Sequence, residues 1–346
     1  MILEVFAASA IAFAATIVGG QFLIPILAQA GLRAQDINKK SRPILPASGG
    51  IILLLGFFIG VIALLFAVDY IIGAQLNSTL LLVALASVVA ISFIGLLDDL
   101  VGSKVRTSKV DAKAIAKNYT FFNGGIRQWQ KPILTIIAAA PLMAINWGSP
   151  IISVPFIGSF ALSQYLYTFI LIPLAVAFSS NSFNMLEGLN GISVQMGLVA
   201  FIALALFAYH TSSYTAFAIA GVFSAALLAY TYYGSYPAKV LPGDSLTYLI
   251  GGAFAATIII GNMQLLGLLL LIPWIAEFVL KGRVRFHANS WGLVQGDGTL
   301  RSPHGDHVYS LTHLFLRTGR FKEWQIPLTL MLVEALIAAA ALAWLW

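Results

Sequence analysis

The sequence predicts a polytopic, all-α membrane protein with about ten transmembrane helices and both termini on the outer side of the membrane. Hydrophobic residues make up 60% of the 346 residues and charged residues only 9%, with a mean hydropathy of +0.91, whereas soluble domains carry about 25% charge. Apolar runs of roughly 20 residues, long enough to cross a bilayer, recur along the whole chain. We therefore expect a single integral membrane domain over residues 1–346.

The candidate spans are 2–29, 48–68, 78–97, 131–147, 163–180, 191–210, 214–232, 245–262, 263–281 and 325–346. The first has no basic segment before it and is longer than the apolar part of a signal peptide, so we interpret it as a retained helix. Residues 245–281 are compatible with one long element or with two. The chain has no cysteine, which excludes disulfides and thiolate metal ligands and leaves carboxylate, amide, imidazole or phosphate groups to bind a metal.

All 19 Lys and Arg residues fall on one side of the membrane when these spans alternate, in or at the edge of the segments 31–47, 98–131, 181–191, 232–244 and 281–324. The opposite segments contain none. Basic residues concentrate on the cytoplasmic side of membrane proteins, so we expect this side to face the cytoplasm, in the cell membrane or in the endoplasmic reticulum membrane of a eukaryote. Part of the charge serves only orientation and contact with anionic lipids.

Most acidic residues share this face, although carboxylates contribute little to orientation. They include Asp36, Asp98, Asp99, Asp111, Glu187, Asp244, Glu277, Asp297 and Asp306. We expect Glu4, Asp69 and Glu334 on the outer side or at its helix ends. No inverted repeat of the kind found in secondary transporters is evident. The acids therefore predict a functional site on the cytoplasmic face.

The paired acids Asp98 and Asp99 end the third predicted span. Two carboxylates at a helix C-terminus repel each other and the helix dipole. They indicate a counter-cation, a bound Mg²⁺ or a protonated carboxyl suited to proton transfer. The alternative is a solvated pair that merely ends a helix.

Three Asn residues and one Glu interrupt two apolar spans at 181–191. Asn184 and Asn190 offer amide oxygens to a metal, and both donors and acceptors to a nucleobase. Glycines such as Gly188 allow close backbone approach, although such loops are often only turns. Asp244 opens the eighth span after Pro-Gly, where it is either a helix cap or a ligand for a hard cation.

Basic residues complete the pattern. Lys131 starts the fourth span, and the last cytoplasmic loop contains Arg283, Arg285, His287, Arg301, His304 and His307. Such groups suit a phosphate or a diphosphate. The spacing of the histidines matches no zinc motif.

With these clusters established, the order of motifs resembles the polyprenyl-phosphate N-acetylhexosamine-1-phosphate transferase superfamily, and most closely its eukaryotic and archaeal UDP-GlcNAc:dolichyl-phosphate GlcNAc-1-phosphate transferase branch. The similarity runs through nearly the whole chain. It is carried by four segments, which are the loop from Gln35 to Gly49, the Asp98-Asp99 pair, the run from Asn181 to Gly191, and Gly243-Asp244-Ser245. The resemblance implies ten helices, dependence on Mg²⁺ with Mn²⁺ as an alternative, and transfer of a sugar 1-phosphate from a UDP-sugar to a lipid phosphate.

The resemblance also implies roles for particular residues. It assigns the metal to Asn184 and Asp244, uridine to Gly188 and Asn190, and phosphate to Lys131. Asp98 and Asp99, which with Lys131 are the expected catalytic residues, lie where the lipid phosphate must approach. We expect further substrate contacts from Asn38, Lys39, Asn181, Arg283, Arg285 and His287. The last three stand where the branch has a Pro-Arg-His-Arg run.

The expected partners are a UDP-N-acetylhexosamine and a dolichyl or polyprenyl phosphate, with no nucleic acid, and a homodimer is allowed. The function expected is the first membrane step of glycan assembly, such as protein N-glycosylation. The alternatives are another UDP-sugar, for example in cell-wall synthesis, or a transporter with a polar path across the membrane. We expect the segment from Asn118 to Trp129 to fold over the site or to lie on the membrane.

Overall fold

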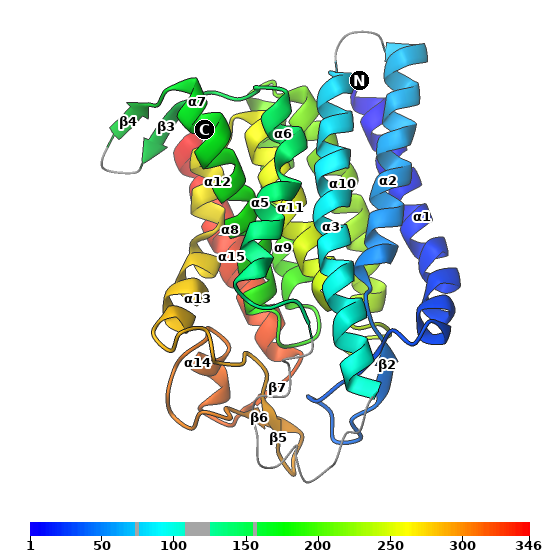
Figure 1. Ribbon diagram of the computed structural model, residues 1–346, viewed down its shortest axis with the longest axis vertical. Helices are drawn as coiled ribbons and strands as arrows, with labels where there is room; N and C mark the ends of the chain where they lie inside the picture. The colour runs from blue at the N-terminus through cyan, green and yellow to red at the C-terminus, as the bar shows by residue number, and fades with distance from the viewer. Residues whose placement is uncertain (73–75, 108–124, 155–157) are drawn as a thin grey trace.

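The computed structural model describes residues 1–72, 76–107, 125–154 and 158–346, and it gives no side-chain placement at 71–72, 103–107 and 153–154. The chain forms a bundle of roughly parallel and antiparallel helices (Figure 1). Its helices are α1 (Ile2–Gln29), α2 (Gly50–Ala67), η1 (Val68–Ile72), α3 (Ser78–Thr107), α5 (Gln130–Ala138), α6 (Ala140–Ala144), α7 (Gln164–Leu166), η2 (Tyr167–Leu171), α8 (Ile172–Leu186), α9 (Ile192–His210), α10 (Tyr214–Gly234), α11 (Gly243–Gly261), α12 (Gln264–Leu270), α13 (Ile272–Gly282), α14 (His313–Leu316) and α15 (Gln325–Leu345).

Eight helices of the described residues are long and apolar enough to cross a membrane, and the bent pair α12–α13 is a ninth candidate. The prediction of a polytopic helical membrane protein is therefore confirmed. The expected span 131–147 is divided into α5 and α6, whose 9 and 5 residues run end to end beside α3 (Figure 1). Pro141 near the start of α6 lacks the N–H needed to continue α5, which explains the break.

Residues 245–281, left as one element or two, contain α11 and the bent pair α12–α13. α11 ends at Asn262, whose backbone is left-handed with φ of 53°. The chain then returns through α12 and α13, which meet at an angle of 57°. Both termini lie at the same end of the bundle (Figure 1), as the even number of expected spans requires.

The described residues also form three small antiparallel sheets, which lie at the ends of the bundle. β1 (Arg33–Gln35) pairs with β2 (Ile44–Pro46), and β5 (Leu293–Val294), β6 (Thr299–Arg301) and β7 (Phe321–Lys322) form a second antiparallel sheet. Both lie at the end opposite the termini, whereas β3 (Ile151–Val154) and β4 (Gly158–Ala161) lie at the other end (Figure 1). The polar loops of the predicted cytoplasmic face are thus gathered at one end.

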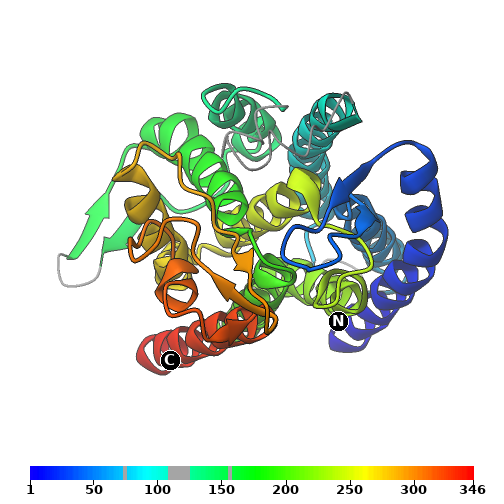
Figure 2. The same cartoon turned by 90° about the horizontal axis from the view of Figure 1, so that it is seen from below.

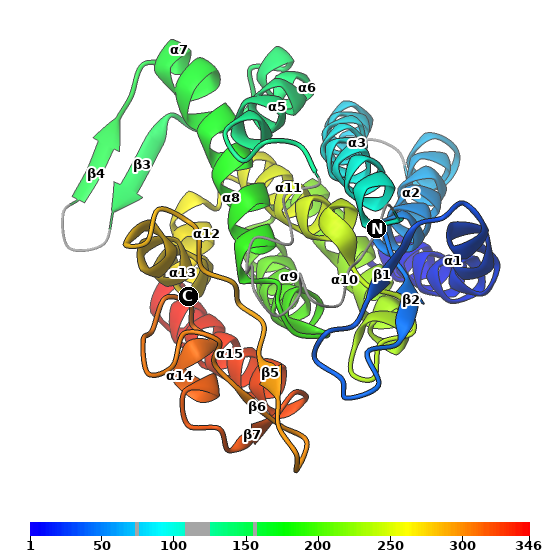
Figure 3. The ribbon, with the colours of Figure 1, turned by 60° about the horizontal axis from the view of Figure 1, so that its bottom comes forward.

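Helix α11 is the central helix of the bundle. Among the candidate spans it has the largest buried share, 83% of its apolar window, and it contacts α3, α8, α10, α2 and α9 (Figure 3). Its small residues Gly251, Gly252 and Ala253, followed after Phe254 by Ala255 and Ala256, let neighbouring helices approach closely, as small residues often do in membrane helices. The start of α11, which carries Asp244, is therefore held by packing on several sides.

Glu334 departs from the prediction. It lies at the middle of α15, where its side chain is fully buried and neither carboxylate oxygen has a hydrogen-bond partner among the described residues. The expected position on the outer side or at a helix end was wrong. The predicted span 325–346 begins at the same residue as α15, so it already placed Glu334 near its centre and not at a helix end.

Candidate active site

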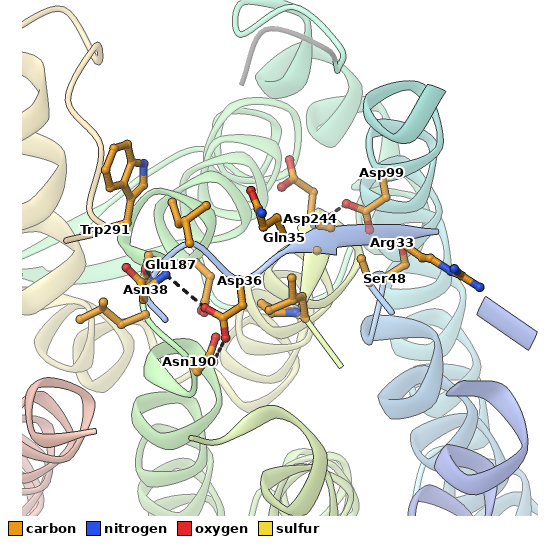
Figure 4. Close-up of a pocket in the computed structure, with 18 of the residues that line it drawn as sticks. Arg33, Gln35, Asp36, Asn38, Ser48, Asp99, Glu187, Asn190, Asp244 and Trp291 are labelled. Atoms are coloured by element: carbon orange, nitrogen blue, oxygen red, sulfur yellow. Dashed lines mark hydrogen bonds between the residues drawn. The ribbon is translucent and has the colours of Figure 1, made fainter. Parts of the chain in front are cut away.

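A pocket of about 190 Å³ lies at the end of the bundle opposite the termini (Figure 4). Its walls come from residues 32–38 and 47–48 of the first loop, 187–190 after α8, and 241–244 at the start of α11, together with Asp99 and Trp291. Figure 2, which views this end of the molecule, shows how these loops converge from helices far apart in sequence.

Three charged residues from three helices meet beside this pocket. The Nζ atom of Lys131, at the start of α5, donates to the carboxylate of Asp98 at 3.0 Å and to that of Asp244 at 2.6 Å. All three side chains are less than a quarter exposed. Removing charges from water is costly unless they are paired, so the ammonium group stabilises both carboxylates. Three of the residues expected at the catalytic and metal sites therefore lie in direct contact.

The second acid of the pair has a different position. Asp99 accepts hydrogen bonds from the backbone N–H groups of Asp244 at 2.8 Å and Ser245 at 3.2 Å. Its carboxylate thus caps the N-terminus of α11, where unpaired N–H groups and the helix dipole favour negative charge. Gly243 makes the approach feasible, because a Cβ atom there would lie 2.3 Å from Asp99 Oδ2.

A close helix contact fixes the same turn from the other side. Gly95 of α3 faces the backbone carbonyl of Asp244, and a Cβ atom on Gly95 would lie only 2.3 Å from that oxygen. A larger residue would push α3 away from α11. The run from Gly95 to Asp99 therefore brings this part of α3 against the first turn of α11 and sets the distance between Asp98 and Asp244. The expectation that the two acids end their helix was wrong, because α3 continues to Thr107.

Asn184 lies next to Asp244. Its Nδ2 donates to Thr247 Oγ1 at 3.0 Å, and that hydroxyl in turn donates to the backbone carbonyl of Asp244 at 3.3 Å. The amide oxygen of Asn184 takes no part in either bond. The two residues expected to bind the metal are thus brought together by α8 and α11.

The side chain of Asn181, one helical turn earlier, forms its hydrogen bonds inside the bundle. Its Nδ2 donates to Thr135 Oγ1 at 3.2 Å and to the carbonyl of Ala177 at 2.7 Å, and its oxygen accepts from Tyr248 at 3.2 Å. Thr135 lies one turn after Lys131 on α5. Asn181 therefore connects α5 to α11 behind the charged cluster, and the structure leaves it no amide hydrogen for the pocket.

The first loop is tied to the rest of the site by a buried network. Asp36 accepts from Asn190 Nδ2 at 2.8 Å and pairs with Lys39 at 3.0 Å. Glu323, just before α15, accepts the backbone N–H of Asn190 at 3.1 Å and also pairs with Lys39. Asn190 and Lys39 are therefore engaged with protein groups, and two acids hold them in place.

Asn38 bridges two further segments. Its Nδ2 donates to the carbonyl of Gly188 at 2.9 Å, and its oxygen accepts the backbone N–H of Gly292 at 3.2 Å. The amide thus joins the first loop, the loop after α8 and the last loop. Glu187, beside Gly188, accepts the N–H of Ser193 at 3.1 Å, and burial raises the pKa of its carboxyl to about 7.

Three expected substrate contacts lie away from the pocket. Arg283, Arg285 and His287 follow the end of α13, and all three are exposed and absent from the pocket lining. The last loop instead contributes Trp291, which belongs to none of the predicted motifs, and neither does Glu323. A tryptophan in a polar loop at the reactive face was the available signal for Trp291. Glu323 offered none, because its partners lie 133 and 284 residues away in sequence.

The segment expected to cover the site is described in part. Residues 118–124 lie outside the described residues. Of the remainder, Ile126 donates its N–H to Asp98 at 2.6 Å, and a Cβ atom on Gly125 would lie 2.4 Å from the same carboxylate oxygen. The described end of the loop therefore folds onto Asp98.

The cluster suits a hard divalent cation. The carboxylates of Asp98, Asp99 and Asp244 outnumber the single ammonium of Lys131, so the cluster carries excess negative charge. The described residues contain no group of three or more His, Asp or Glu side chains arranged to hold a metal. Mg²⁺ commonly uses only one or two carboxylates and completes its shell with water and substrate phosphates. Asp244 and the amide oxygen of Asn184, which takes no part in the bond to Thr247, fit that pattern.

Comparisons with known proteins show the family of this chain. Residues 81–262 match the model of glycosyl transferase family 4. A protein of Saccharolobus solfataricus, provisionally named UDP-N-acetylglucosamine–dolichyl-phosphate N-acetylglucosaminephosphotransferase, is 37% identical over 89% of this chain and 86% of its own. A protein of Sulfolobus acidocaldarius with the same provisional name is 32% identical over 96% and 93%.

A more distant relative comes from a bacterium. The phospho-N-acetylmuramoyl-pentapeptide-transferase of Clostridium novyi is 26% identical over 79% of this chain and 82% of its own. The matched family segment contains Asp98, Lys131, Asn184 and Asp244. The chain therefore belongs to glycosyl transferase family 4 and is a membrane enzyme that transfers a sugar 1-phosphate to a polyprenyl phosphate.

Proposed function

We propose that this protein transfers GlcNAc-1-phosphate from UDP-GlcNAc to a dolichyl or polyprenyl phosphate and releases UMP, with its active site facing the cytoplasm. The observation that carries the proposal is the contact of Lys131 with both Asp98 and Asp244 beside the pocket. The provisional names of the archaeal relatives supply the choice of donor and acceptor. The one-sided distribution of Lys and Arg supports the orientation.

The position of the cluster suits one lipid and one soluble substrate. Exposed apolar side chains flank it on α3 and α5, among them Leu97, Val101 and Ile133, whereas the pocket on the other side is lined by polar loops. A lipid phosphate arriving along the bilayer surface can reach Asp98 and Lys131 from the apolar side. A nucleotide sugar can enter the pocket from the aqueous side.

The reaction follows from these positions. An oxygen of the lipid phosphate attacks the β-phosphorus of the nucleotide sugar, a new P–O bond forms, and the bond to the oxygen that bridges to the α-phosphate breaks, so UMP departs with that oxygen. Phosphoryl transfer depends mainly on positioning and electrostatic stabilisation. Lys131 binds phosphate oxygens, and Asp98 orients Lys131. The acceptor is already largely ionised near neutral pH, with a second pKa of about 6 by analogy with phosphoserine.

Asp244 and Asn184 would hold Mg²⁺, with Mn²⁺ as a substitute. The bound cation would neutralise charge on the diphosphate. Asp99 keeps the Asp244 backbone in place, since it binds the N–H of that residue. Glycan assembly, such as protein N-glycosylation, would use the lipid-linked product.

The test is an assay of the purified protein with a panel of UDP-sugars, dolichyl phosphate and Mg²⁺, in which UMP and the lipid-linked product are measured. We expect UDP-GlcNAc to be the best donor. Asp244→Ala should abolish Mg²⁺-dependent UMP release while the protein still inserts and purifies, and Asp306→Ala, on an exposed loop, should behave as wild type. A clear preference for another UDP-sugar would overturn the donor assignment, and normal turnover by Asp244→Ala would overturn the metal assignment.

A further inference from the structure

Trp291 is the one aromatic residue among the described residues that line the pocket. Figure 4 shows it at one end of the pocket, beside Asn38 and Glu187, with Asp99 and Asp244 toward the other end. The pocket thus has an acidic end, next to Lys131, and an end that offers an aromatic ring. A nucleotide also has two different ends, because its ribose separates the charged phosphates from the planar base.

The backbone on both sides of Trp291 is firmly held. Ser290 donates its hydroxyl to the carbonyl of Met185 at 3.1 Å, and a Cβ atom on Gly188 would lie 2.6 Å from the Ser290 carbonyl carbon. On the other side, Gly292 donates its N–H to Asn38 at 3.2 Å. The indole is therefore mounted on a rigid segment that contacts the two loops carrying Asn38 and Gly188.

The indole itself is not held by a hydrogen bond. Its Nε1–H is buried and has no partner among the described residues. Buried Trp N–H groups usually find an acceptor, and leaving one unpaired is unfavourable. The indole N–H therefore lacks a hydrogen bond among the described residues. A small rotation of the ring that brings this N–H onto an oxygen of a bound ligand would be favourable.

Resting on the proposed function, we propose that Trp291 binds the uridine of the donor: its ring face stacks on the planar pyrimidine, and its in-plane N–H donates to a ribose oxygen of the same nucleotide. The diphosphate then extends toward Asp244 and Lys131. Stacking on an aromatic side chain recognises a planar base through its π-face. Trp291 is therefore a substrate-binding residue of the last loop, separate from Arg283, Arg285 and His287.

The experiment measures the dissociation constant of UMP by calorimetry on the full-length purified protein. Trp291→Phe keeps a ring, whereas Trp291→Leu keeps apolar bulk without a π-face. We expect Trp291→Leu to bind UMP roughly 5- to 150-fold more weakly than wild type, as stacking energies imply, and Trp291→Phe to lose much less. Trp346→Phe, at the far end of the bundle beside His210, is the matched control.

A second ligand separates stacking from a structural effect. The saturated base of 5,6-dihydro-UMP is not planar, so wild type should bind it more weakly than UMP, whereas Trp291→Leu should bind both ligands about equally. UMP binding by Trp291→Leu within twofold of wild type would overturn the inference, as would equal discrimination by both proteins. If the wild type neither bound UMP nor released it, the proposed function itself would fail, so the two failures are distinguishable.

Discussion

The carboxylate of Asp99 accepts the backbone N–H of Asp244 at 2.8 Å, while its neighbour Asp98 pairs with Lys131. Two adjacent acids therefore have different roles. Asp98 belongs to the charged cluster, and Asp99 caps the helix that presents Asp244. The sequence alone offered no way to separate them, because they are adjacent residues of the same helix, α3.

This division predicts different outcomes for the two acids. Asp99→Ala should destabilise the protein by about 0.5–2 kcal/mol, the usual cost of losing a helix cap, and should lower turnover because Asp244 shifts. Asp98→Asn should reduce kcat with little change in stability. Thermal unfolding in detergent and UMP release measure the two effects. Equal loss of stability in both variants would contradict the division.

Replacing Lys131 by Met should lower kcat by about 10²- to 10³-fold, the range found when one stabilising donor is removed from an active site. The substitution removes the phosphate-binding ammonium and leaves Asp98 and Asp244 without their counter-ion. The exposed residue Lys322 provides the control, as Lys322→Met should retain wild-type turnover. Steady-state kinetics with both substrates varied would reveal whether turnover or only binding is affected.

Asn184→Leu should raise the Mg²⁺ concentration needed for half-maximal activity, because it removes an amide oxygen beside Asp244. Asn181→Leu, one turn away, should instead lower thermal stability, since Asn181 links Thr135 to Tyr248. Its Mg²⁺ requirement should stay close to that of wild type. Activity measured against Mg²⁺ concentration, together with unfolding curves, checks both outcomes. Identical Mg²⁺ curves for Asn184→Leu and wild type would remove Asn184 from the metal site.

Glu323→Gln should raise the KM for the UDP-sugar more than it lowers kcat. The carboxylate holds both Lys39 and the backbone of Asn190, so its loss loosens the pocket wall without touching the charged cluster. A double-mutant cycle with Lys39→Met measures the coupling. Additive effects of the two substitutions would show that the ion pair does not position the pocket.

Glu187 should make stability depend on pH. Burial raises its pKa from the ordinary 4.5 to about 7, so between these values the folded protein retains a proton that the unfolded chain releases. The contribution of Glu187 to the free energy of unfolding should therefore be fully present below about pH 4.5. It should be lost as pH rises through 7, by at most about 1.4 kcal/mol per pH unit.

The control for this pH effect is Glu187→Gln, which keeps an acceptor for Ser193 but cannot ionise. Thermal unfolding of both proteins between pH 5 and pH 8 isolates the contribution of this carboxyl. The difference in stability between the two proteins should change with pH over this range. A constant difference would show that Glu187 ionises as readily when folded as when unfolded.

The sequence by itself determined that the chain is a helical membrane protein with its charged residues on one face. Hydropathy and charge along a helix are local properties, and a span of apolar residues must cross the bilayer whatever its neighbours are. The motifs containing Asp98, Asn184 and Asp244 also indicated the residues of the candidate site. The structure brings these residues together at one end of the bundle, beside Lys131.

Only the tertiary structure decided which of these residues belongs to the charged cluster and which caps a helix or holds a loop. The contacts of Glu323 and Asp99 join segments separated by up to 284 residues, and Trp291 reaches the pocket from the last loop. These positions depend on how α3, α8, α11 and α15 pack. Likewise, the burial of Glu334 follows from the face of α15 that packs against the rest of the bundle. Helix formation is set by neighbours in sequence, whereas the partner of a buried polar group is set by neighbours in space, which no local pattern encodes.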